Sequence, residues 1–327
     1  MRDRSLEPNR STRIYRLDHD VDAELYLLDT REAREIAAWP HVVMGELDRR
    51  ALSTASACVE FLARIGALSG PLVVLHVLRA GPGYRVAEAL RGRGLTFREL
   101  YVRPEYLATS ERDHTGESVR EVRVTFSDFS QAPGGEKITL IKPDTEATGR
   151  TGLISLETAF RELEARSSTV RTLVLYGFIT DVAVRRIARF AADRGVGRVV
   201  AVGLVDLAAL ASNDYDMVLY GPDLHAWRIN RELVRLGATV GLETFADMVR
   251  IYVPGLDQPG DFSERQLSLF NGTGWTSGDI LGHLRSTEGA IETLLTVPDL
   301  EDWQREIAEE ELNRVRELAG RLSGQTV

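Results

Sequence analysis

The sequence predicts an α/β protein whose central parallel sheet is flanked by helices. Four continuous apolar runs, beginning near Leu72, Ile138, Val170 and Val199, have the composition of strands buried on both faces. Helical patterns separate most of these runs, as expected for parallel strands joined by right-handed crossovers. The 327 residues are enough to bury a full core.

The composition is that of an ordinary globular protein with an excess of acidic residues. Hydrophobic residues make up 43% of the chain, charged residues 27%, and the net charge is −9. This charge argues against nucleic-acid binding through a basic surface. The single cysteine, Cys58, excludes an internal disulfide, and we expect it to be buried. With no signal-like segment and no apolar run of membrane length, we expect a cytoplasmic protein that does not contact membranes.

The elements before the first apolar run are expected to be an arm, a strand and two helices. Residues 1–20 are rich in arginine and aspartate and are expected to form a loose arm. A short strand at 22–28 and helices at 31–39 and 44–65 follow from the apolar spacing. We divide the chain into three parts: an N-terminal arm with the first elements (1–40), a main domain (41–265) and a helical C-terminal extension (266–327).

The first apolar run, 72–78, leads into a glycine-containing loop at 79–84 and then a short helix. Arg79 places a guanidinium at the carboxyl end of the strand, where ligands of open α/β sheets bind. Gly81 and Gly83 allow close approach of the backbone to a ligand, and guanidinium pairs well with phosphate oxygens. A surface arginine in a glycine turn explains the pattern about equally well.

Two alternating segments, 97–106 and 119–129, predict antiparallel strands joined by a polar loop. Asp113 and His114 at the tip of this loop are expected to be solvated rather than catalytic. His76, inside the first apolar run, is expected to be a core histidine.

The second apolar run begins the stretch 138–152, which is the most informative part of the chain. A polar turn and then a helix follow it, with Ala147-Thr148-Gly149-Arg150-Thr151 between strand and helix. Backbone N–H groups at a helix N-terminus favour an anion, and Asp144 supplies a neighbouring carboxylate. The pattern fits a sugar-phosphate site, although an ordinary βα turn is about as compatible. The glycine-lysine spacing of a P-loop is absent.

Strands at 170–177 and 199–205, with a helix capped by Asp181 between them, continue the α/β pattern. The second of these strands is expected to end at Asp206. The stretch 207–248 reads as a less regular insertion with a short strand at 217–220 and an amphipathic helix at 228–236.

A loop rich in glycine and proline, 251–262, is the last informative stretch, and two helices are expected after it. Its rigid, exposed backbone suits recognition of a planar ligand through main-chain amides, although such loops usually only turn the chain. A short helix around Trp275 and Leu284 and a longer one from about residue 299 are expected to cap the core or to form a dimer surface.

Three of these stretches together resemble the motifs of type I phosphoribosyltransferases, in particular uracil phosphoribosyltransferases. Leu-Arg-Ala-Gly-x-Gly at 78–83 is similar to the pyrophosphate loop and 138–152 to the PRPP-binding motif. Tyr-x-Pro-Gly-Leu and the following Gly-Asp, within 252–261, are similar to the base-binding segment. The departures are Pro143 at the first acidic position, Arg150 at the second glycine, Asp257-Gln258-Pro259 in place of Gly-Asp-Ala, and Phe262 in place of arginine.

The resemblance implies transfer of ribose 5-phosphate from PRPP to a uracil-related or other heterocycle, with release of pyrophosphate. It also implies a hood at about 97–130, Mg²⁺ held through PRPP rather than by protein ligands, and a homodimer or higher homo-oligomer. Asp144 and Arg79 are the implied catalytic residues, steadying the ribose and holding pyrophosphate respectively. The implied PRPP-binding residues are Arg79, Ala80, Gly81, Arg103, Asp144, Thr145, Glu146, Ala147, Thr148, Gly149, Arg150 and Thr151. The implied base-binding residues are Tyr252, Val253, Gly255, Asp257, Gln258, Pro259 and Asp261.

The departures keep two alternatives open. Pro143 and Gln258 each remove an acid of the resembled motifs, which favours a non-catalytic PRPP- or nucleotide-binding regulatory protein. Pro259 has no N–H to offer a base, and Phe262 replaces a charged residue, which favours an enzyme acting on an unusual heterocycle.

Overall fold

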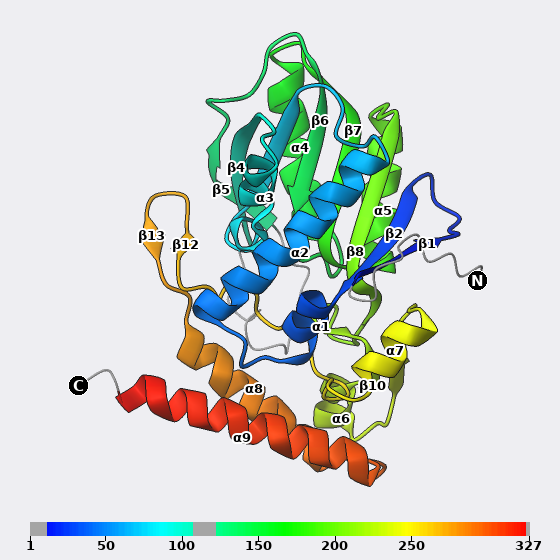
Figure 1. Ribbon diagram of the computed structural model, residues 1–327, viewed down its shortest axis with the longest axis vertical. Coiled ribbons are helices and arrows are strands. Elements are labelled where there is room, and N and C mark those ends of the chain that lie inside the picture. Colours follow the sequence, from blue (N-terminus) through cyan, green and yellow to red (C-terminus); the bar gives the residue numbers. More distant parts are fainter. Residues whose placement is uncertain (1–11, 107–121, 325–327) are drawn as a thin grey trace.

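The computed structural model describes residues 12–106 and 122–324, and a nine-stranded sheet forms its centre (Figure 1). The strand order is β1-β2-β8-β7-β6-β3-β4-β5, and β9 pairs with β8. Neighbours from β2 to β4 in this order are parallel, whereas β1, β5 and β9 pair antiparallel. The predicted parallel α/β class is confirmed. The strands are β1 (Thr12–Leu17), β2 (Glu24–Thr30), β3 (Leu72–Val77), β4 (Phe97–Tyr106), β5 (Val122–Asp128), β6 (Lys137–Pro143), β7 (Thr169–Thr180), β8 (Arg198–Leu210) and β9 (Met217–Val218).

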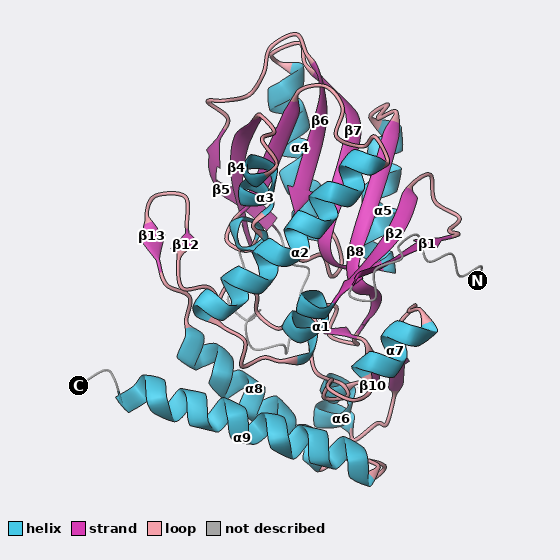
Figure 2. Cartoon of the chain, in the orientation of Figure 1, coloured by secondary structure: helices cyan, strands magenta, loops and turns pink. Residues whose placement is uncertain are grey.

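Helices cover both faces of this sheet (Figure 2). Val74 and the other strand residues on its face of the sheet pack against α1, α2 and α3. Val73 and the strand residues on the opposite face pack against α4 and α5. This alternation follows from the two-residue period of a strand and explains why the apolar runs are continuous. The helices are α1 (Arg31–Ala38), α2 (Met44–Arg64), α3 (Val86–Gly92), α4 (Arg150–Glu164) and α5 (Asp181–Asp193).

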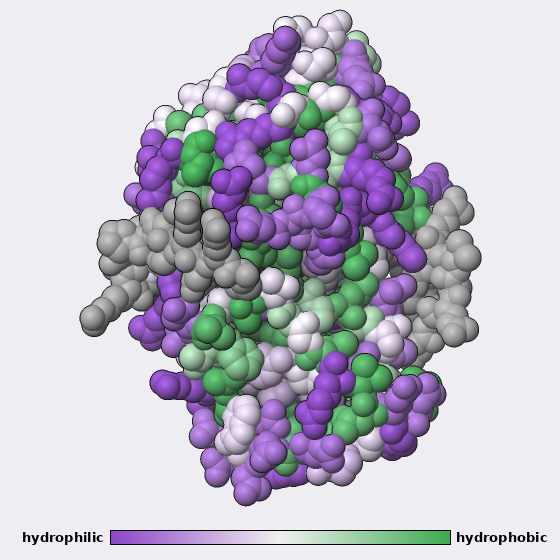
Figure 3. Space-filling view, turned by 90° about the vertical axis from the view of Figure 1, so that its right-hand side faces the viewer, coloured by the Kyte–Doolittle hydropathy of each residue, from purple (hydrophilic) through white to green (hydrophobic). Residues whose placement is uncertain are grey.

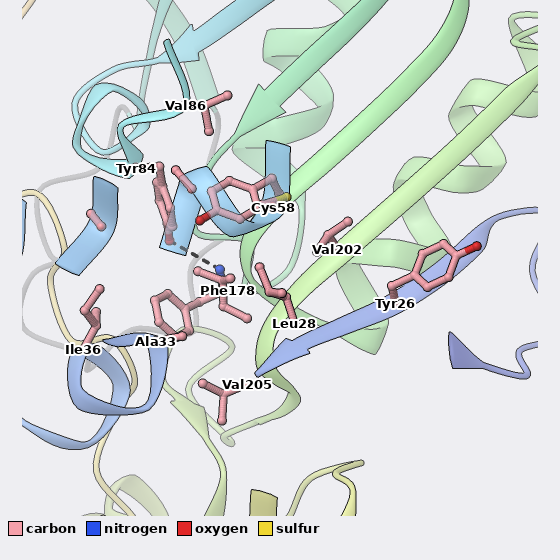
Figure 4. Close-up of a cluster of buried hydrophobic side chains, with 14 of the residues drawn as sticks. Tyr26, Leu28, Ala33, Ile36, Cys58, Tyr84, Val86, Phe178, Val202 and Val205 are labelled. Carbon is pink, nitrogen blue, oxygen red and sulfur yellow. Dashed lines mark hydrogen bonds between the residues drawn. The ribbon is translucent and has the colours of Figure 1, made fainter. Parts of the chain in front are cut away.

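The first of these two core clusters contains Cys58 (Figure 4). Burial raises the pKa of its thiol, and the side chain packs as a small apolar group, as predicted. Tyr84 lies in the same cluster, and its hydroxyl accepts a hydrogen bond from the Phe178 amide, 3.4 Å away. The core therefore reaches up to the loop that follows β3.

The two antiparallel hood strands are confirmed as β4 and β5 over their described residues. Asp113 and His114 lie outside the described residues. His76 is buried in β3, with Nε2 3.0 Å from Glu99 and its ring stacked on Tyr101, as predicted for a core histidine.

Three expectations about element ends were wrong. Residues 12–17 form β1 rather than part of a loose arm, because Ile14 and Tyr15 bury in the two core clusters on opposite faces of the sheet. Thr180, not Asp181, caps α5 by accepting a hydrogen bond from the Ala183 amide. Strand β8 does not end at Asp206 but continues to Leu210 through a register shift.

The stretch 207–248 was also predicted incorrectly in part. The helix expected at 228–236 is misplaced: α6 (Leu224–Asn230) shares only residues 228–230 with that range and ends where Arg231 turns to φ +56°. Further on, β11 (Arg235–Gly237) pairs with β10 (Tyr220–Pro222). Asp223 starts α6 by capping two of its amides, a signal that lies before the expected range. A further helix, α7 (Leu242–Met248), was not anticipated.

The C-terminal part contains the two expected helices, α8 (Ile280–Leu295) and α9 (Asp302–Gly324). Trp275 was expected to be helical, but it lies in β13 (Trp275–Thr276). This strand forms a hairpin with β12 (Leu269–Phe270). Asp279 caps α8, which explains why the helix starts later. A third apolar cluster joins α6, α8 and α9 to Val253 and Leu256, so these helices cap the loop at 251–262.

The surface is mostly hydrophilic over the sheet and its helices, with hydrophobic side chains showing over the lower half of the face in Figure 3. Exposed apolar residues include Ile229 on α6 and Leu242 and Phe245 on α7. Among the described residues, no helix is both long enough and apolar enough to cross a membrane.

Candidate functional site

A cavity of about 460 Å³ lies at the carboxyl edge of the sheet, and we call it the sheet-edge cavity. Ligands of parallel α/β sheets bind at this edge, because the loops that leave neighbouring strands meet there. The lining residues come from five segments of the chain: 77–80 after β3, 103–106 in β4, 144–151 after β6, 214–217 after β8, and 257–263.

The loop after β3 contributes Arg79 and Ala80 to the wall of this cavity. A short 3-10 helix, η1 (Gly81–Tyr84), turns the chain directly afterwards. Gly81 does not line the cavity; a Cβ there would lie 3.2 Å from the Pro143 carbonyl, so glycine permits the close packing of two loops. The Arg79 guanidinium donates to Oε1 of the buried Glu264 at 2.6 Å, which ties this loop to the segment beyond 257.

The loop after β6 meets the N-terminus of α4 at the cavity. Gly149 adopts φ +72° at the N-cap position, and no side chain caps the helix. Thr148 and Thr151 line the cavity, and neither hydroxyl has a hydrogen-bond partner within the described part of the chain. Arg186 donates to the Thr148 carbonyl at 2.6 Å and holds the loop from outside. Together, the uncapped helix end and the two available hydroxyls form a cradle of hydrogen-bond donors, an arrangement that favours an anion.

Beneath this cradle lies a buried ionic cluster of Lys142, Asp144 and Glu146. The ammonium of Lys142 donates to Asp144 Oδ2 at 2.9 Å and to Glu146 Oε1. Burial raises the pKa of both carboxyls, against the influence of the lysine, and that of Glu146 reaches about 7. Burial alone would lower the pKa of Lys142, but the two carboxylates outweigh it and raise the pKa. The lysine therefore stays charged at neutral pH.

Lys142 was missed in the sequence, although a signal was present. Lysine is almost never fully buried unless it is paired, yet this one lies in a strand that is buried from Ile138 to Pro143. Residues 142, 144 and 146 also follow the two-residue period of a strand, which places them on one side. Only Asp144 of the three lines the cavity; Glu146 lies beneath it against Gly152, where any Cβ would clash with its carboxylate.

Asp144 has internal partners on both carboxylate oxygens. Oδ2 accepts from Lys142, and Oδ1 accepts from the Thr145 amide at 2.9 Å. Each oxygen retains further acceptor capacity, so the residue can also receive hydroxyl donors from the cavity. Arg150, by contrast, is exposed at the start of α4 and does not line the cavity, although its guanidinium lies 3.9 Å from the carboxylate of Asp214, which does.

Arg103 reaches the cavity from the hood strand β4. Its Nη1 donates to the Asn271 carbonyl at 2.9 Å, which joins the hood to the β12–β13 hairpin. Phe270 of this hairpin packs edge-on against Tyr101 of β4. The hood is thus braced by residues that follow the 251–262 loop.

The loop at 251–262 divides between cavity lining and internal structure. Asp257 and Asp261 line the sheet-edge cavity, and Asp257 Oδ1 accepts from the Met217 amide at 2.7 Å. Tyr252 is buried, donating to the Leu256 carbonyl and accepting from the Leu219 amide. Val253, Gln258 and Pro259 line neither cavity described here, and Val253 is core. The side-chain amide of Gln258 has no hydrogen-bond partner within the described residues, whereas its backbone N–H donates to the Met217 carbonyl at 2.8 Å.

A fully buried arginine, Arg265, holds this loop in place. Its guanidinium donates to the carbonyls of Ile36 at 3.0 Å, Trp39 at 2.9 Å and Val42 at 2.7 Å, and also to that of Pro259. Burial lowers the pKa of Arg265 to about 10. Its sequence context, between two polar residues, gives no hint that it is buried.

A second cavity of about 550 Å³, which we call the helix-side cavity, adjoins the first. Gly255 lines it, and helices α6 and α8 supply much of the rest of its wall. Four residues line both cavities: Tyr215, Asp257, Gly260 and Asp261. Tyr215, like Asp214, comes from the loop after β8, which sequence reasoning left unassigned. The described residues contain no cluster of three or more metal-binding side chains.

Comparison with known proteins finds likeness in structure but not in sequence. No family model matches the chain, and no curated protein matches it significantly. Solved structures similar to it include orotate phosphoribosyltransferase from Aeropyrum pernix, with 22% identity over 47% of this chain and 76% of that one and a TM-score of 0.29. Adenine phosphoribosyltransferase from Leishmania donovani shows 16% identity over 60% of this chain and 89% of that one, with a TM-score of 0.36. The corresponding Trypanosoma brucei enzyme, in complex with AMP, pyrophosphate and ribose-5-phosphate, shows 13% identity over 55% and 83%, with a TM-score of 0.35.

Proposed function

We propose that this protein is a phosphoribosyltransferase, which transfers ribose 5-phosphate from PRPP to a heterocyclic acceptor and releases pyrophosphate. One observation carries the proposal: the three stretches that resemble phosphoribosyltransferase motifs, far apart in sequence, contribute residues to a single cavity. Arg79, Asp144 with the 147–151 cradle, and Asp257 with Asp261 all line it.

Each part of PRPP has a matching group in the sheet-edge cavity. The 5-phosphate is held by the uncapped N-terminus of α4 and the hydroxyls of Thr148 and Thr151. Asp144 accepts hydrogen bonds from ribose hydroxyls and stabilises positive charge that develops at C1. Pyrophosphate pairs with Arg79, whose guanidinium already lies at the cavity wall, and Arg103 contacts it from the hood.

Magnesium fits this scheme as a partner of the substrate. The described residues offer no ready three-ligand metal site, and magnesium commonly keeps several waters and binds phosphate oxygens beside one or two carboxylates. Asp144, beside the cradle, is the carboxylate that would contribute to such a shell. The ion would neutralise charge on the departing pyrophosphate. Catalysis then depends mainly on positioning and electrostatic stabilisation.

A non-catalytic PRPP- or nucleotide-binding regulator of the same fold is the second candidate. It is favoured by the replacement of one motif acid by Pro143 and by the two internal partners that already occupy Asp144. A cradle with these features binds PRPP without necessarily promoting cleavage of its C1–O bond. The homo-oligomer and the cytoplasmic location implied by the sequence remain predictions.

Release of pyrophosphate from Mg·PRPP, measured against a panel of heterocycles, separates the two functions. Transfer predicts release that depends on one acceptor and falls about a hundredfold or more in Asp144→Asn. Asp193→Asn, an exposed site at the end of α5, is the control and retains the wild-type rate. Calorimetric binding of PRPP without release in the presence of any acceptor contradicts transfer and supports the regulator.

A further inference from the structure

The helix-side cavity is built largely by two segments that the phosphoribosyltransferase resemblance leaves unexplained. Helix α6 belongs to the 207–248 insertion, and α8 belongs to the C-terminal extension. They pack on each other through the third apolar cluster, which also contains Val253 and Leu256 of the 251–262 loop. The resulting volume of about 550 Å³ falls within the range of small-molecule sites.

The lining of this cavity is acidic in sum. Five carboxylates line it against two guanidinium groups, those of the exposed Arg228 and Arg285. Some of the carboxylates also accept hydrogen bonds within the fold; Asp279 Oδ1 accepts from the Gly282 amide at 2.8 Å. A carboxylate that accepts such a bond keeps its charge and further lone pairs. The cavity therefore favours a ligand that donates hydrogen bonds over one that carries negative charge. The carboxylates are those of Asp216, Asp257, Asp261, Glu264 and Asp279.

An independent feature of the same wall is His283 on α8, which is only 6% exposed. Its Nε2 lies 3.0 Å from the Pro40 carbonyl oxygen. Because a carbonyl can only accept, Nε2 carries the hydrogen, and a neutral imidazole then keeps its lone pair on Nδ1. Burial, with a smaller contribution from Arg265, lowers the pKa of His283 to about 3, so the ring is neutral at physiological pH. Within the described part of the chain, Nδ1 has no hydrogen-bond partner and is a free acceptor.

The free nitrogen of His283 lies close to the wall that the two cavities share. A Cβ on Gly260 would lie 3.1 Å from Cε1 of His283 and 3.7 Å from Nδ1, so this edge of the ring faces Gly260. Gly260 lines both cavities, as do Tyr215, Asp257 and Asp261. Glycine at this position places no side chain against the ring edge. A ligand that donates to Nδ1 would therefore lie next to the site proposed for PRPP.

We infer that the helix-side cavity binds the acceptor and that His283 selects a heterocycle with an exocyclic amino group, which donates a hydrogen bond to Nδ1. The inference rests on the proposed function and names the class of its acceptor. The surrounding carboxylates favour the same group, because an amino group donates and carries no negative charge. An exocyclic oxygen in its place would set its lone pairs against that of Nδ1. A site built around one hydrogen bond in this way discriminates against the analogue that cannot form it.

Matched ligand pairs test the inference on the full-length protein. Cytosine is compared with uracil, and adenine with hypoxanthine, by calorimetry in the presence and absence of Mg·PRPP. The members of each pair differ in an amino group against an oxygen at one ring position. We expect the amino member of at least one pair to bind about tenfold more tightly or better. Binding of Mg·PRPP alone is measured in the same samples.

Substitution of His283 assigns the preference to its Nδ1. His283→Gln keeps an N–H group for the Pro40 carbonyl and removes the ring nitrogen, so the amino preference should disappear. A merely structural role would weaken both members of a pair equally and leave their ratio unchanged. His19→Gln, the same change outside both cavities, is the matched control and should keep the preference. Gly260→Ala, which places a methyl group against the ring edge, should also remove it and decides the test if His283→Gln does not fold.

The outcomes separate this inference from the proposed function. Equal binding of both members of each pair, tighter binding of the oxo member, binding of none, or an amino preference that survives in His283→Gln overturns the inference. If Mg·PRPP binds to the wild type in those samples, the proposed function stands without it. If Mg·PRPP does not bind while the amino preference depends on His283, the cavity binds an amino heterocycle, but the acceptor role and the proposed function both fail.

Discussion

Two buried cations support two different loops that line the sheet-edge cavity, and they stabilise these loops by different means. Lys142, under the 144–151 loop, pairs with two carboxylates. Arg265, behind the 251–262 loop, pairs with main-chain carbonyls of four residues. One cation is thus part of an ionic cluster, and the other is part of a neutral scaffold.

The difference divides the site into a titratable half and a half that does not titrate near neutral pH. Glu146, with a pKa of about 7, can exchange a proton beneath the 147–151 cradle at physiological pH. Arg265, with a pKa of about 10, keeps its charge throughout that range, and carbonyl oxygens do not ionise. The side proposed to bind PRPP should therefore respond to pH, while the side proposed to bind the acceptor should keep its geometry.

The largest expected effect comes from Lys142→Met, which leaves two buried carboxylates without their cation. Breaking a buried ion pair in this way costs about 3–5 kcal/mol in the free energy of unfolding. Chemical denaturation at pH 7 measures the loss. Lys137→Met, at the exposed start of the same strand, is the matched control. A loss no larger than that of the control would mean that the cluster does not stabilise the loop.

The next effect comes from Arg265→Met, which leaves several buried carbonyls without donors. A loss of about 3 kcal/mol is expected, since a single unsatisfied buried group costs about 1–3 kcal/mol. Because the scaffold holds the 251–262 loop, acceptor binding should suffer more than PRPP binding. Calorimetry of both ligands measures this selectivity, with Arg250→Met, an exposed neighbour of the loop, as control. Equal loss of both affinities would contradict the division of the site.

A smaller effect is expected in the pH dependence of stability. The pKa of Glu146 is raised from 4.5 to about 7, so its stabilising contribution is present below pH 4.5 and is lost as pH rises through 7. The difference in unfolding free energy between wild type and Glu146→Gln should fall by up to about 3 kcal/mol across this window. Denaturation at several pH values measures it, with Glu157→Gln on the exposed face of α4 as control. Parallel curves for wild type and Glu146→Gln would contradict the raised pKa.

The sheet could be predicted well from the sequence because parallel strands that are buried on both faces consist of continuous apolar runs. The runs at 72–78 and 138–141 correspond to β3 and β6, and the loops after them reach the same cavity. Local spacing carries this information, since strand and helix periods are short-range properties. The helix predicted at 228–236 was misplaced because the prediction used apolar spacing and not the capping residues. Asp223 caps the start of α6, and Arg231 ends it.

The residues that the sequence could not place are those whose partners are remote. Arg265 contacts carbonyls near residue 40, more than 200 positions away in the chain. Arg228 and Arg285 share a cavity only because α6 and α8 pack together. No local pattern encodes such contacts, whereas Lys142 could have been found because its partners lie two and four residues away.

The claim that the sheet-edge cavity binds PRPP is tested most directly by removing two hydroxyls from the cradle. Thr148→Val/Thr151→Val preserves side-chain shape and breaks no hydrogen bond within the described residues. We expect Mg·PRPP to bind the wild type in calorimetry and to bind the double variant about tenfold or more weakly. Thr158→Val, on the same helix but outside the cavity, should bind like the wild type. Absence of binding to the wild type, or equal affinity for the double variant, would contradict the assignment.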